Sequence, residues 1–275
     1  MNVGILHPGE MGASLGAALV SAGHTVFWSK AGRSVASAGR AGDDGLRAVE
    51  SLGELVRTVS VIVSICPPAN ALEQARAVAG AGFDGLYVDA NAVSPETVQM
   101  IASTLAGVAE FVDGGVIGPP ARRAGTTRLY LSGPRAKDIA ALFDGSLVEA
   151  CAIDGGPAAA STLKMCYAAW TKGSAALLMA VAALARRERL GDVLAREWGL
   201  SQPGLAEKLQ GTALSTAPKA WRFSDEMAEI ATTFREADMP DGFHLAAADI
   251  FGRLSGLKNE TVTDSETILE LLARQ

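Results

Sequence analysis

A glycine-rich segment near the start of the chain is the first indication of chemistry. His7, Gly9 and Gly12 have the spacing of the three glycines in a dinucleotide-binding turn, with Glu10 and Met11 before the last. Such a turn leaves unpaired N–H groups at a helix start, where the helix dipole favours an anion. In dinucleotide enzymes this anion is the pyrophosphate, so we expect Gly9, Glu10, Met11 and Gly12 to bind cofactor. His7 replaces the first glycine and opens the turn slightly.

The neighbouring elements support this interpretation. Residues 2–6 form an apolar run typical of a short buried strand, residues 13–22 are predicted to be helical, and Gly23 closes the helix as a C-cap. A second strand is expected at residues 25–28. The alternative is a glycine-rich strand–helix turn that binds nothing, as some doubly wound folds have.

The segment after the second predicted strand indicates which dinucleotide binds. An acidic residue at this position accepts hydrogen bonds from the ribose hydroxyls of NAD. Here the segment has no acid and carries Ser29, Lys30, Arg33 and Ser34. Cations and hydroxyl donors suit the 2′-phosphate of NADP, so we predict NADP as cofactor. The alternative is a solvated basic loop.

Lys164 is the candidate for proton transfer. It lies between Leu163 and Met165 in residues 158–187, where no residue except Gly173 interrupts a helical pattern. A lysine that is desolvated on an apolar helix has a lowered pKa and can exchange a proton near neutral pH. The alternative is a lysine whose stem lies along the helix while its ammonium group reaches water.

Up to residue 153 the chain alternates between predicted strands and helices. Residues 59–65 are β-branched and mostly apolar, as in a central parallel strand. We expect residues 1–153 to form an NADP-binding Rossmann domain, an α/β doubly wound parallel sheet. The predicted strands are residues 2–6, 25–28, 46–49, 59–65, 86–89, 110–114, 128–131 and 147–152, and further helices are predicted at 52–57, 69–79, 95–105 and 136–143.

From residue 154 onward the strand signal stops. Pro157 suits the first turn of a helix, and the long helix that follows joins the two halves. We expect residues 154–275 to form an all-helical domain for substrate binding and dimerisation. Its further predicted helices are residues 192–197, 204–210, 218–236, 242–254 and 264–274.

Composition narrows the class of protein. The net charge of −6 makes nucleic acid an unexpected partner. Cys66, Cys151 and Cys166 show no paired spacing, so we expect reduced core residues in a cytoplasmic protein. The three histidines are scattered, so we expect no metal site. We expect no targeting segment and no membrane span, because the apolar stretch 173–185 is shorter than the roughly 20 residues that a span needs. We interpret that stretch as a buried helix.

Four motifs in order resemble the β-hydroxyacid dehydrogenase and 6-phosphogluconate dehydrogenase superfamily. The opening Val-Gly-Ile-x-x-x-Gly-x-Met-Gly is similar to the N-terminal fingerprint, and residues 89–95 resemble the Asp-x-Ser-Thr-x-x-Pro segment beside the nicotinamide. Residues 113–126 resemble the substrate loop, and residues 155–164 resemble the helix that carries the active-site lysine. Residues 164–173 resemble a branch with a short, distinct C-terminal helical domain.

The resemblance implies an oxidoreductase that transfers a hydride between NADP and a hydroxyl or carbonyl carbon of a small substrate. It implies that Lys164 is the general acid/base. By the same resemblance, Asn91 joins the cofactor site, to which we also assign Cys66 and Pro67, and substrate is expected at Ile117, Gly118 and Tyr167.

Two segments depart from the family pattern. Tyr167 stands where the family usually has asparagine, so its phenol either meets the reacting oxygen or lines an apolar pocket. The family's Ser-Gly-Gly is replaced by Ile117, Gly118 and Pro119, which removes a hydroxyl and an N–H. Two alternatives therefore stay open: an imine reductase that uses Tyr167, and a non-catalytic NADP-binding protein.

Other residues carry weaker hypotheses. Arg122 and Arg123 could meet an anionic substrate or be solvated, and His244 could enter the site or be a core or surface residue. Trp170 and Trp221 are expected to pack. We predict a homodimer, because a helix of about 30 residues rich in Ala and Gly cannot bury all its faces against one small domain. Further apolar stripes are expected from Phe223, Ile230, Phe234, Phe243, Leu245, Ile250 and Phe251.

Overall fold

The computed structural model describes residues 1–258, 260 and 262–274, and it divides into two compact units. The first unit is Met1–Met165 and the second is Cys166–Gln275. The division lies inside helix α7 (Ala159–Arg187), whereas the sequence places the domain boundary before this helix, between residues 153 and 154. The difference arises because the opening turns of α7 pack on the sheet of the first unit.

The first unit is built on an eight-stranded sheet of order β3-β2-β1-β4-β5-β6-β7-β8. The first six strands run parallel, in the order of a dinucleotide-binding sheet, so the predicted fold class is confirmed. The strands are β1 (Asn2–Ile5), β2 (Thr25–Ser29), β3 (Arg47–Val49), β4 (Val61–Ser64), β5 (Leu86–Asp89), β6 (Glu110–Ile117), β7 (Thr127–Ser132) and β8 (Val148–Ala152).

The expectation of a parallel sheet throughout is wrong at one edge. Strand β7 runs antiparallel to β6, and β8 runs parallel to β7. A parallel connection needs a crossover of about a dozen residues or more, usually a helix. The connection from β6 to β7, residues 118–126, contains no helix. The chain therefore turns back beside β6.

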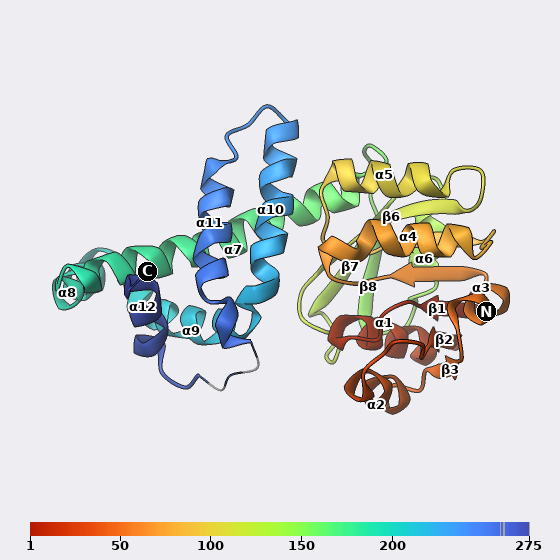
Figure 1. Cartoon of the computed structure of the whole chain (residues 1–275), viewed down its shortest axis with the longest axis horizontal. Helices are drawn as coiled ribbons and strands as arrows, with labels where there is room; N and C mark the ends of the chain where they lie inside the picture. Colours follow the sequence, from red (N-terminus) through yellow and green to blue (C-terminus); the bar gives the residue numbers. More distant parts are fainter. Residues whose placement is uncertain (259, 261, 275) are drawn as a thin grey trace. The chain divides into compact units, whose positions relative to one another are not determined.

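Helices cover both faces of this sheet (Figure 1). Strand and helix residues form two apolar clusters, one on each face, as alternation along buried strands requires. One face carries α1 (Glu10–Ser21), α2 (Val35–Asp43) and α6 (Ala136–Ala141), and the other carries α3 (Leu52–Thr58), α4 (Ala71–Gly80) and α5 (Pro95–Leu105). Sequence analysis did not predict α2, a helix of nine residues that contains two glycines and buries only Ala41.

The second unit is helical. After α7 it contains α8 (Gly191–Ser201), α9 (Leu205–Thr216), α10 (Ala220–Glu236), α11 (Gly242–Arg253) and α12 (Ser265–Arg274). Lys172 of α7 forms an ion pair of 2.5 Å with Glu226 of α10, and both side chains are mostly buried. Phe251 and Ile230 are buried within this unit, so they are not available to a dimer interface as we expected.

Helix α7 exposes one apolar side. Trp170 is 74% exposed and Leu184 is 61% exposed, which corrects the expectation of a packed tryptophan and a buried helix. Cys151 and Cys166 are also exposed rather than core residues. Within the described residues, α7 alone is long and apolar enough to cross a membrane by length and composition. A core helix of a soluble protein passes the same test, so this carries no conclusion.

A buried carboxylate ends strand β5. Asp89 has no exposed surface, and its two oxygens accept the backbone N–H of Asn91 at 2.9 Å and the side-chain amide of Asn91 at 3.0 Å. Burial raises the pKa of Asp89 to about 7, which the hydrogen bonds from Asn91 oppose and the neighbouring Asp113 reinforces.

We predict that Asp89 makes the first unit less stable as the pH rises from about 4 to about 7. In this window the unfolded chain releases the proton that the folded chain retains, so folding loses free energy until both forms are ionised. The wild type minus Asp89→Asn difference in the free energy of unfolding should fall across this range by up to about 4 kcal/mol. Urea unfolding at several pH values measures this difference. Asp84→Asn, at an exposed acid of the same unit, is the control; parallel profiles for wild type and Asp89→Asn would contradict the prediction.

Candidate functional site

The predicted cofactor residues gather at one edge of the sheet. Because β1, β2, β4, β5 and β6 run parallel, the loops after them leave from the same carboxyl edge. Strand β1 lies between β2 and β4, so the chain direction across the sheet reverses here. In open α/β sheets, ligands bind outside such a switch point.

The turn between β1 and α1 has the geometry of an anion site. Gly9 is the N-cap of α1 and supplies no side-chain hydrogen bond, so the first N–H groups of the helix are not capped by a side chain. A side chain on Gly9 would meet no atom within 4 Å, which leaves room for a ligand. A side chain on Gly12 would clash with the carbonyl oxygen of His7, so glycine is required for the helix to pack on this turn.

Two buried polar atoms at this edge have no hydrogen-bond partner in the described structure: Nδ1 of His7 and Nε of Arg33. Burial, assisted by the charge of Arg33, lowers the pKa of His7 to about 4, so its imidazole is neutral at physiological pH. Burial also lowers the pKa of Arg33. The phosphates and ribose hydroxyls of a dinucleotide offer partners to such atoms, so these residues fit the cofactor.

The other predicted cofactor residues at and after the end of β2 already have protein partners or are buried. Ser29 is buried at the end of β2, and Lys30 forms an exposed ion pair of 2.7 Å with Glu50. The Ser34 hydroxyl caps α2 by accepting the N–H of Ser37 at 3.2 Å. Arg33 differs from these residues, because its Nε is buried without a hydrogen-bond partner in the described structure and its charge affects the pKa values of His7 and Cys66.

Asn91 lies at the predicted edge but uses its side chain internally. Its Oδ1 accepts the N–H of Cys66 at 2.6 Å, and its Nδ2 donates to Ser64 at 3.2 Å and to Asp89. The amide therefore supports the backbone that leads to Pro67, which is itself exposed. Burial raises the pKa of the Cys66 thiol to about 12, which keeps the thiol protonated.

The predicted substrate loop begins with one buried and one exposed residue. Ile117 is 4% exposed, so its side chain belongs to the interior. Gly118 is exposed and has a φ of 118°, and a side chain here would clash with the backbone of Thr126. The loop therefore offers backbone rather than side-chain groups at this point.

The same loop is tied to the cofactor-binding elements. The guanidinium of Arg122 makes two hydrogen bonds, of 2.5 and 2.8 Å, to the carboxylate of Asp44 at the end of α2. The N–H of Ala121 donates to the Ser14 hydroxyl of α1 at 3.1 Å. Arg122 is thus already engaged by Asp44, whereas Arg123 is exposed.

Lys164 lies where α7 meets β6. A side chain on Gly115, two residues before the end of β6, would lie 2.5 Å from the carbonyl oxygen of Ala160 and 3.1 Å from Cβ of Lys164. Lys164 is half-buried. Tyr167 follows three residues later on the same helix, in the second unit, and is 45% exposed.

His244 belongs to the interior of the second unit. It is 7% exposed, its ring centroid lies 4.1 Å from that of Phe234, and burial lowers its pKa. Its aromatic packing matches a core residue.

Sequence analysis assigned no role to Asp113 or Ser161, which the structure joins beside Lys164. Both lie within the motifs that carry the family resemblance, so their position was the available signal.

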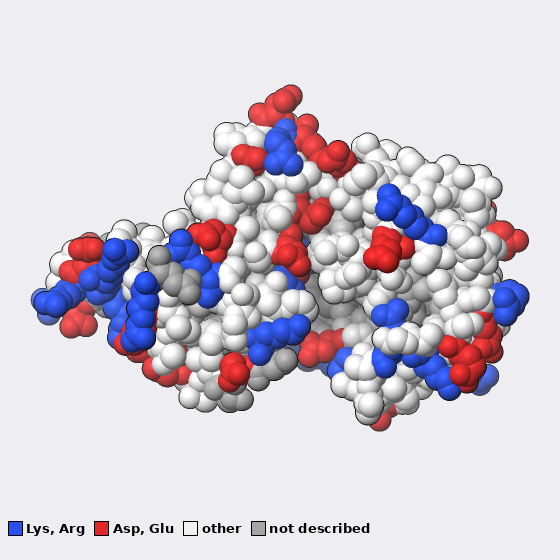
Figure 2. Space-filling model, viewed as in Figure 1, with Lys and Arg blue, Asp and Glu red and all other residues white. Residues whose placement is uncertain are grey.

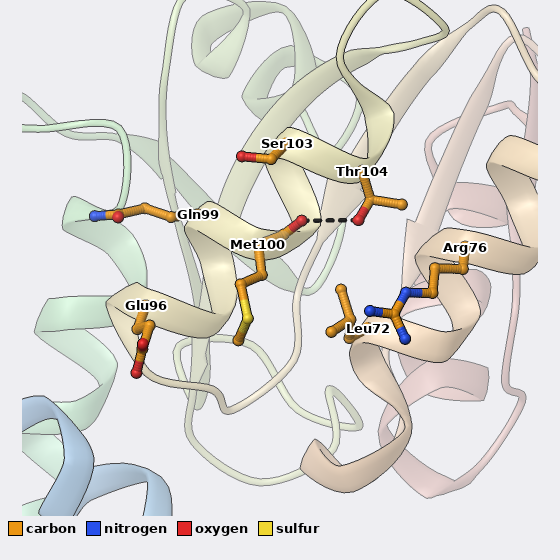
Figure 3. Close-up of a pocket in the computed structure, with 7 residues that line it drawn as sticks. All are labelled: Leu72, Arg76, Glu96, Gln99, Met100, Ser103 and Thr104. Atoms are coloured by element: carbon orange, nitrogen blue, oxygen red, sulfur yellow. Dashed lines mark hydrogen bonds between the residues drawn. The ribbon is translucent and has the colours of Figure 1, made fainter.

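A separate groove lies between α4 and α5 (Figure 3). Leu72 and Arg76 line it from α4, and Glu96 and Met100 from α5. None of the predicted site residues lines this groove. On the face shown in Figure 2, basic side chains are mixed with acidic ones.

Comparisons with known proteins follow the two units. Residues 2–142 match the NAD binding domain of 6-phosphogluconate dehydrogenase, and residues 185–254 match a domain of unknown function, DUF1932. An uncharacterized 28.5 kDa protein of Methanothermus fervidus is 32% identical over 151 residues. That match covers 54% of this chain and 57% of the relative, so it spans little more than half of either.

Solved structures extend the likeness over the whole chain. The conserved protein MTH1747, of unknown function and described as structurally similar to 3-hydroxyacid dehydrogenases, is 29% identical, with a TM-score of 0.68 over 98% of this chain and 99% of its own. The 3-hydroxyisobutyrate dehydrogenase of Mycobacterium tuberculosis is 17% identical, with a TM-score of 0.70 and 98% of each chain covered. An imine reductase of Streptomyces aurantiacus is 16% identical, with a TM-score of 0.54 and 99% of each chain covered. The last two share the fold.

The first family match covers more than half of the chain, and the family resemblance inferred from the sequence is confirmed. The chain belongs to the family of the NAD binding domain of 6-phosphogluconate dehydrogenase, and its first unit is an NAD(P)-binding domain.

Proposed function

We propose that the chain is an NADP-dependent oxidoreductase that acts on a hydroxyl or carbonyl carbon of a small substrate, with Lys164 as general acid/base. The observation that carries the proposal is the position of Lys164 against β6, near the carboxyl edge that also bears the open turn at Gly9. One side of the site can hold the cofactor phosphates, and the other presents an amine.

When bound, the nicotinamide supplies or accepts the hydride. The chain must move a proton on the substrate oxygen, and Lys164 is the group suited to it. Two other titratable groups at this edge have strongly shifted pKa values: burial raises the pKa of the Cys66 thiol to about 12 and lowers the pKa of His7 to about 4.

The preference for NADP is supported by the segment after β2, where residues 29–34 contain no acid that could accept the ribose hydroxyls. Arg33 in this segment has a buried Nε without a hydrogen-bond partner in the described structure, and its charge affects the pKa of His7 in the glycine-rich turn. The N-terminus of α2, capped by Ser34, adds a dipole that favours a phosphate.

Arg33→Ala should weaken binding of NADPH by about 1.5–3 kcal/mol, the contribution of a charge-assisted hydrogen bond, and should leave NADH binding nearly unchanged. Titration calorimetry with both cofactors measures the two affinities. Arg57→Ala, at an exposed cation of the same unit, is the control and should change neither. Equal losses for NADPH and NADH in Arg33→Ala would contradict the assignment.

Lys164→Ala should lower kcat by about 10²–10⁴-fold, the range for a lost general acid/base, while NADPH affinity is retained. Lys164→Arg should not restore turnover, because guanidinium stays protonated. Screening hydroxyacids, aldehydes, ketones and cyclic imines by NADPH absorbance provides the substrate, and Lys137→Ala, at an exposed lysine, is the control. Wild-type turnover in Lys164→Ala would overturn the proposed mechanism.

A second candidate is an imine reductase that uses the exposed phenol of Tyr167. A loss of kcat in Tyr167→Phe as large as in Lys164→Ala would favour this candidate, whereas a loss under about tenfold would mean that Tyr167 only lines the pocket.

A third candidate, a non-catalytic NADP-binding protein, is supported by the replacement of the family's Ser-Gly-Gly by Ile117, Gly118 and Pro119. NADPH binding without turnover across the whole screen would favour it.

We further propose a homodimer formed through α7. Exposed apolar side chains recur on this helix at intervals of three, four and seven residues, as on a helix that packs against another helix. They are Tyr167, Trp170, Leu177, Val181 and Leu184. Isolated apolar residues on a surface are ordinary, but a continuous stripe of this length marks an interface.

Light scattering should show a dimer at micromolar concentration, and the double variant Trp170→Glu/Leu177→Glu should be monomeric because each charge would be buried unpaired. Val108→Glu, at an exposed apolar residue outside α7, should remain dimeric. A monomeric wild type would exclude this interface.

We expect the protein to act in the cytoplasm on small molecules, and its three free cysteines suit a reducing compartment.

A further inference from the structure

A second buried carboxylate, Asp113 on β6, receives the start of α7. Asp113 has no exposed surface. Its Oδ1 accepts the hydroxyl of Ser161 at 2.5 Å, and its Oδ2 accepts the backbone N–H of Ser161 at 2.9 Å. A single carboxylate therefore binds both the main chain and the side chain of one residue in the first turn of the helix.

Ser132 on β7 completes the arrangement. Its hydroxyl donates to Oδ2 of Asp113 at 2.9 Å, and its oxygen accepts the N–H of Ala160 at 3.1 Å. The first N–H groups of a helix have no partner within the helix, so two of them are satisfied here by groups from two neighbouring strands. The negative charge also lies at the favourable end of the helix dipole.

Strand β6 also determines how closely the turn of α7 that carries Lys164 approaches the sheet. Asp113 and Gly115 lie two residues apart on β6, so they face the same side of the sheet. Gly115 has no side chain at the point where the carbonyl oxygen of Ala160 and Cβ of Lys164 come near. Hydrogen bonds thus hold one turn of α7 in register while a glycine admits the turn that carries Lys164.

We propose that Asp113, through Ser132 and Ser161, is a positioning residue that sets the register of α7 on β6 and thereby the place of the Lys164 ammonium group. This inference rests on the proposed role of Lys164. A serine or asparagine in place of Asp113 could not accept all three hydrogen bonds with a full charge, so the first turn of α7 would shift or loosen.

The experiment compares Asp113→Asn and Ser161→Ala with Asp154→Asn, which changes an exposed acid before α7. Lysines are reductively methylated with ¹³C-formaldehyde and a borane or borohydride reductant, and the Lys164 resonance is assigned by its loss in Lys164→Ala. We expect this resonance to move in Asp113→Asn and Ser161→Ala and to stay in Asp154→Asn. On the substrate found by screening, we expect kcat to fall about 10- to 100-fold in the first two variants, with the KM for NADPH within about twofold of wild type.

The outcomes separate this inference from the proposed function. If Asp113→Asn and Ser161→Ala fold, and both the Lys164 resonance and kcat are unchanged, the positioning role is wrong although Lys164→Ala is inactive. Parallel losses of kcat and NADPH affinity would mean a general structural role and would also overturn it. If Lys164→Ala keeps turnover, the proposed function fails, while the resonance still tests the register. Ser161→Ala removes one hydroxyl, so it keeps the test decisive if Asp113→Asn does not fold.

Discussion

By our proposal, the site depends on the hydrogen bonds between the Asp113 carboxylate and the first turn of α7. They join the helix that bears Lys164 to the sheet that bears the cofactor turn. The hydrogen bond from the N–H of Ala160 to the Ser132 hydroxyl adds a second connection between the helix and the sheet. Strand pairing extends the connection, because Asp113 lies opposite Asp89 in the register of β5 and β6.

The two neighbouring carboxylates, Asp89 and Asp113, bind different segments at the carboxyl edge of the sheet. Asp89 binds Asn91, which in turn binds the N–H of Cys66, so one acid holds the loops after β4 and β5. Asp113 holds the helix after the last strand of the sheet. Burial raises the pKa of both acids, and the hydrogen bonds that each accepts oppose this rise without cancelling it.

The strand and helix pattern of the first unit could be predicted because buried strands and amphipathic helices leave strong periodicities. Helix α2 could not, because it is only nine residues long, contains two glycines and buries only Ala41. The direction of β7 was readable in principle, since no helix was predicted between β6 and β7, and a parallel crossover needs one. The exposure of Trp170 has no signal in sequence, because composition does not tell which side of a long helix other helices cover.

At the candidate site, the sequence predicted where residues lie better than it predicted which residues they contact. The glycines of the turn lie where their spacing placed them, since close approach permits only glycine at Gly12. The burial of Arg33 Nε and the hydrogen bonds of the Asn91 amide with Cys66 and Ser64 arise from packing between residues far apart in the sequence. Likewise, Asp113 and Ser161 are 48 residues apart in the sequence, with β7, α6 and β8 between them, and only the folded sheet brings them together.

The central claim is that the cofactor turn and Lys164 serve one reaction at one edge of the sheet. A crystal structure of the chain with NADP⁺ bound tests it most directly. The account predicts the pyrophosphate over Gly9 and Gly12, the 2′-phosphate beside Arg33, and the nicotinamide ring at the ends of β5 and β6, with the Lys164 ammonium facing the space in front of it. A nicotinamide bound elsewhere, or a Lys164 side chain directed away from that space, would contradict the account.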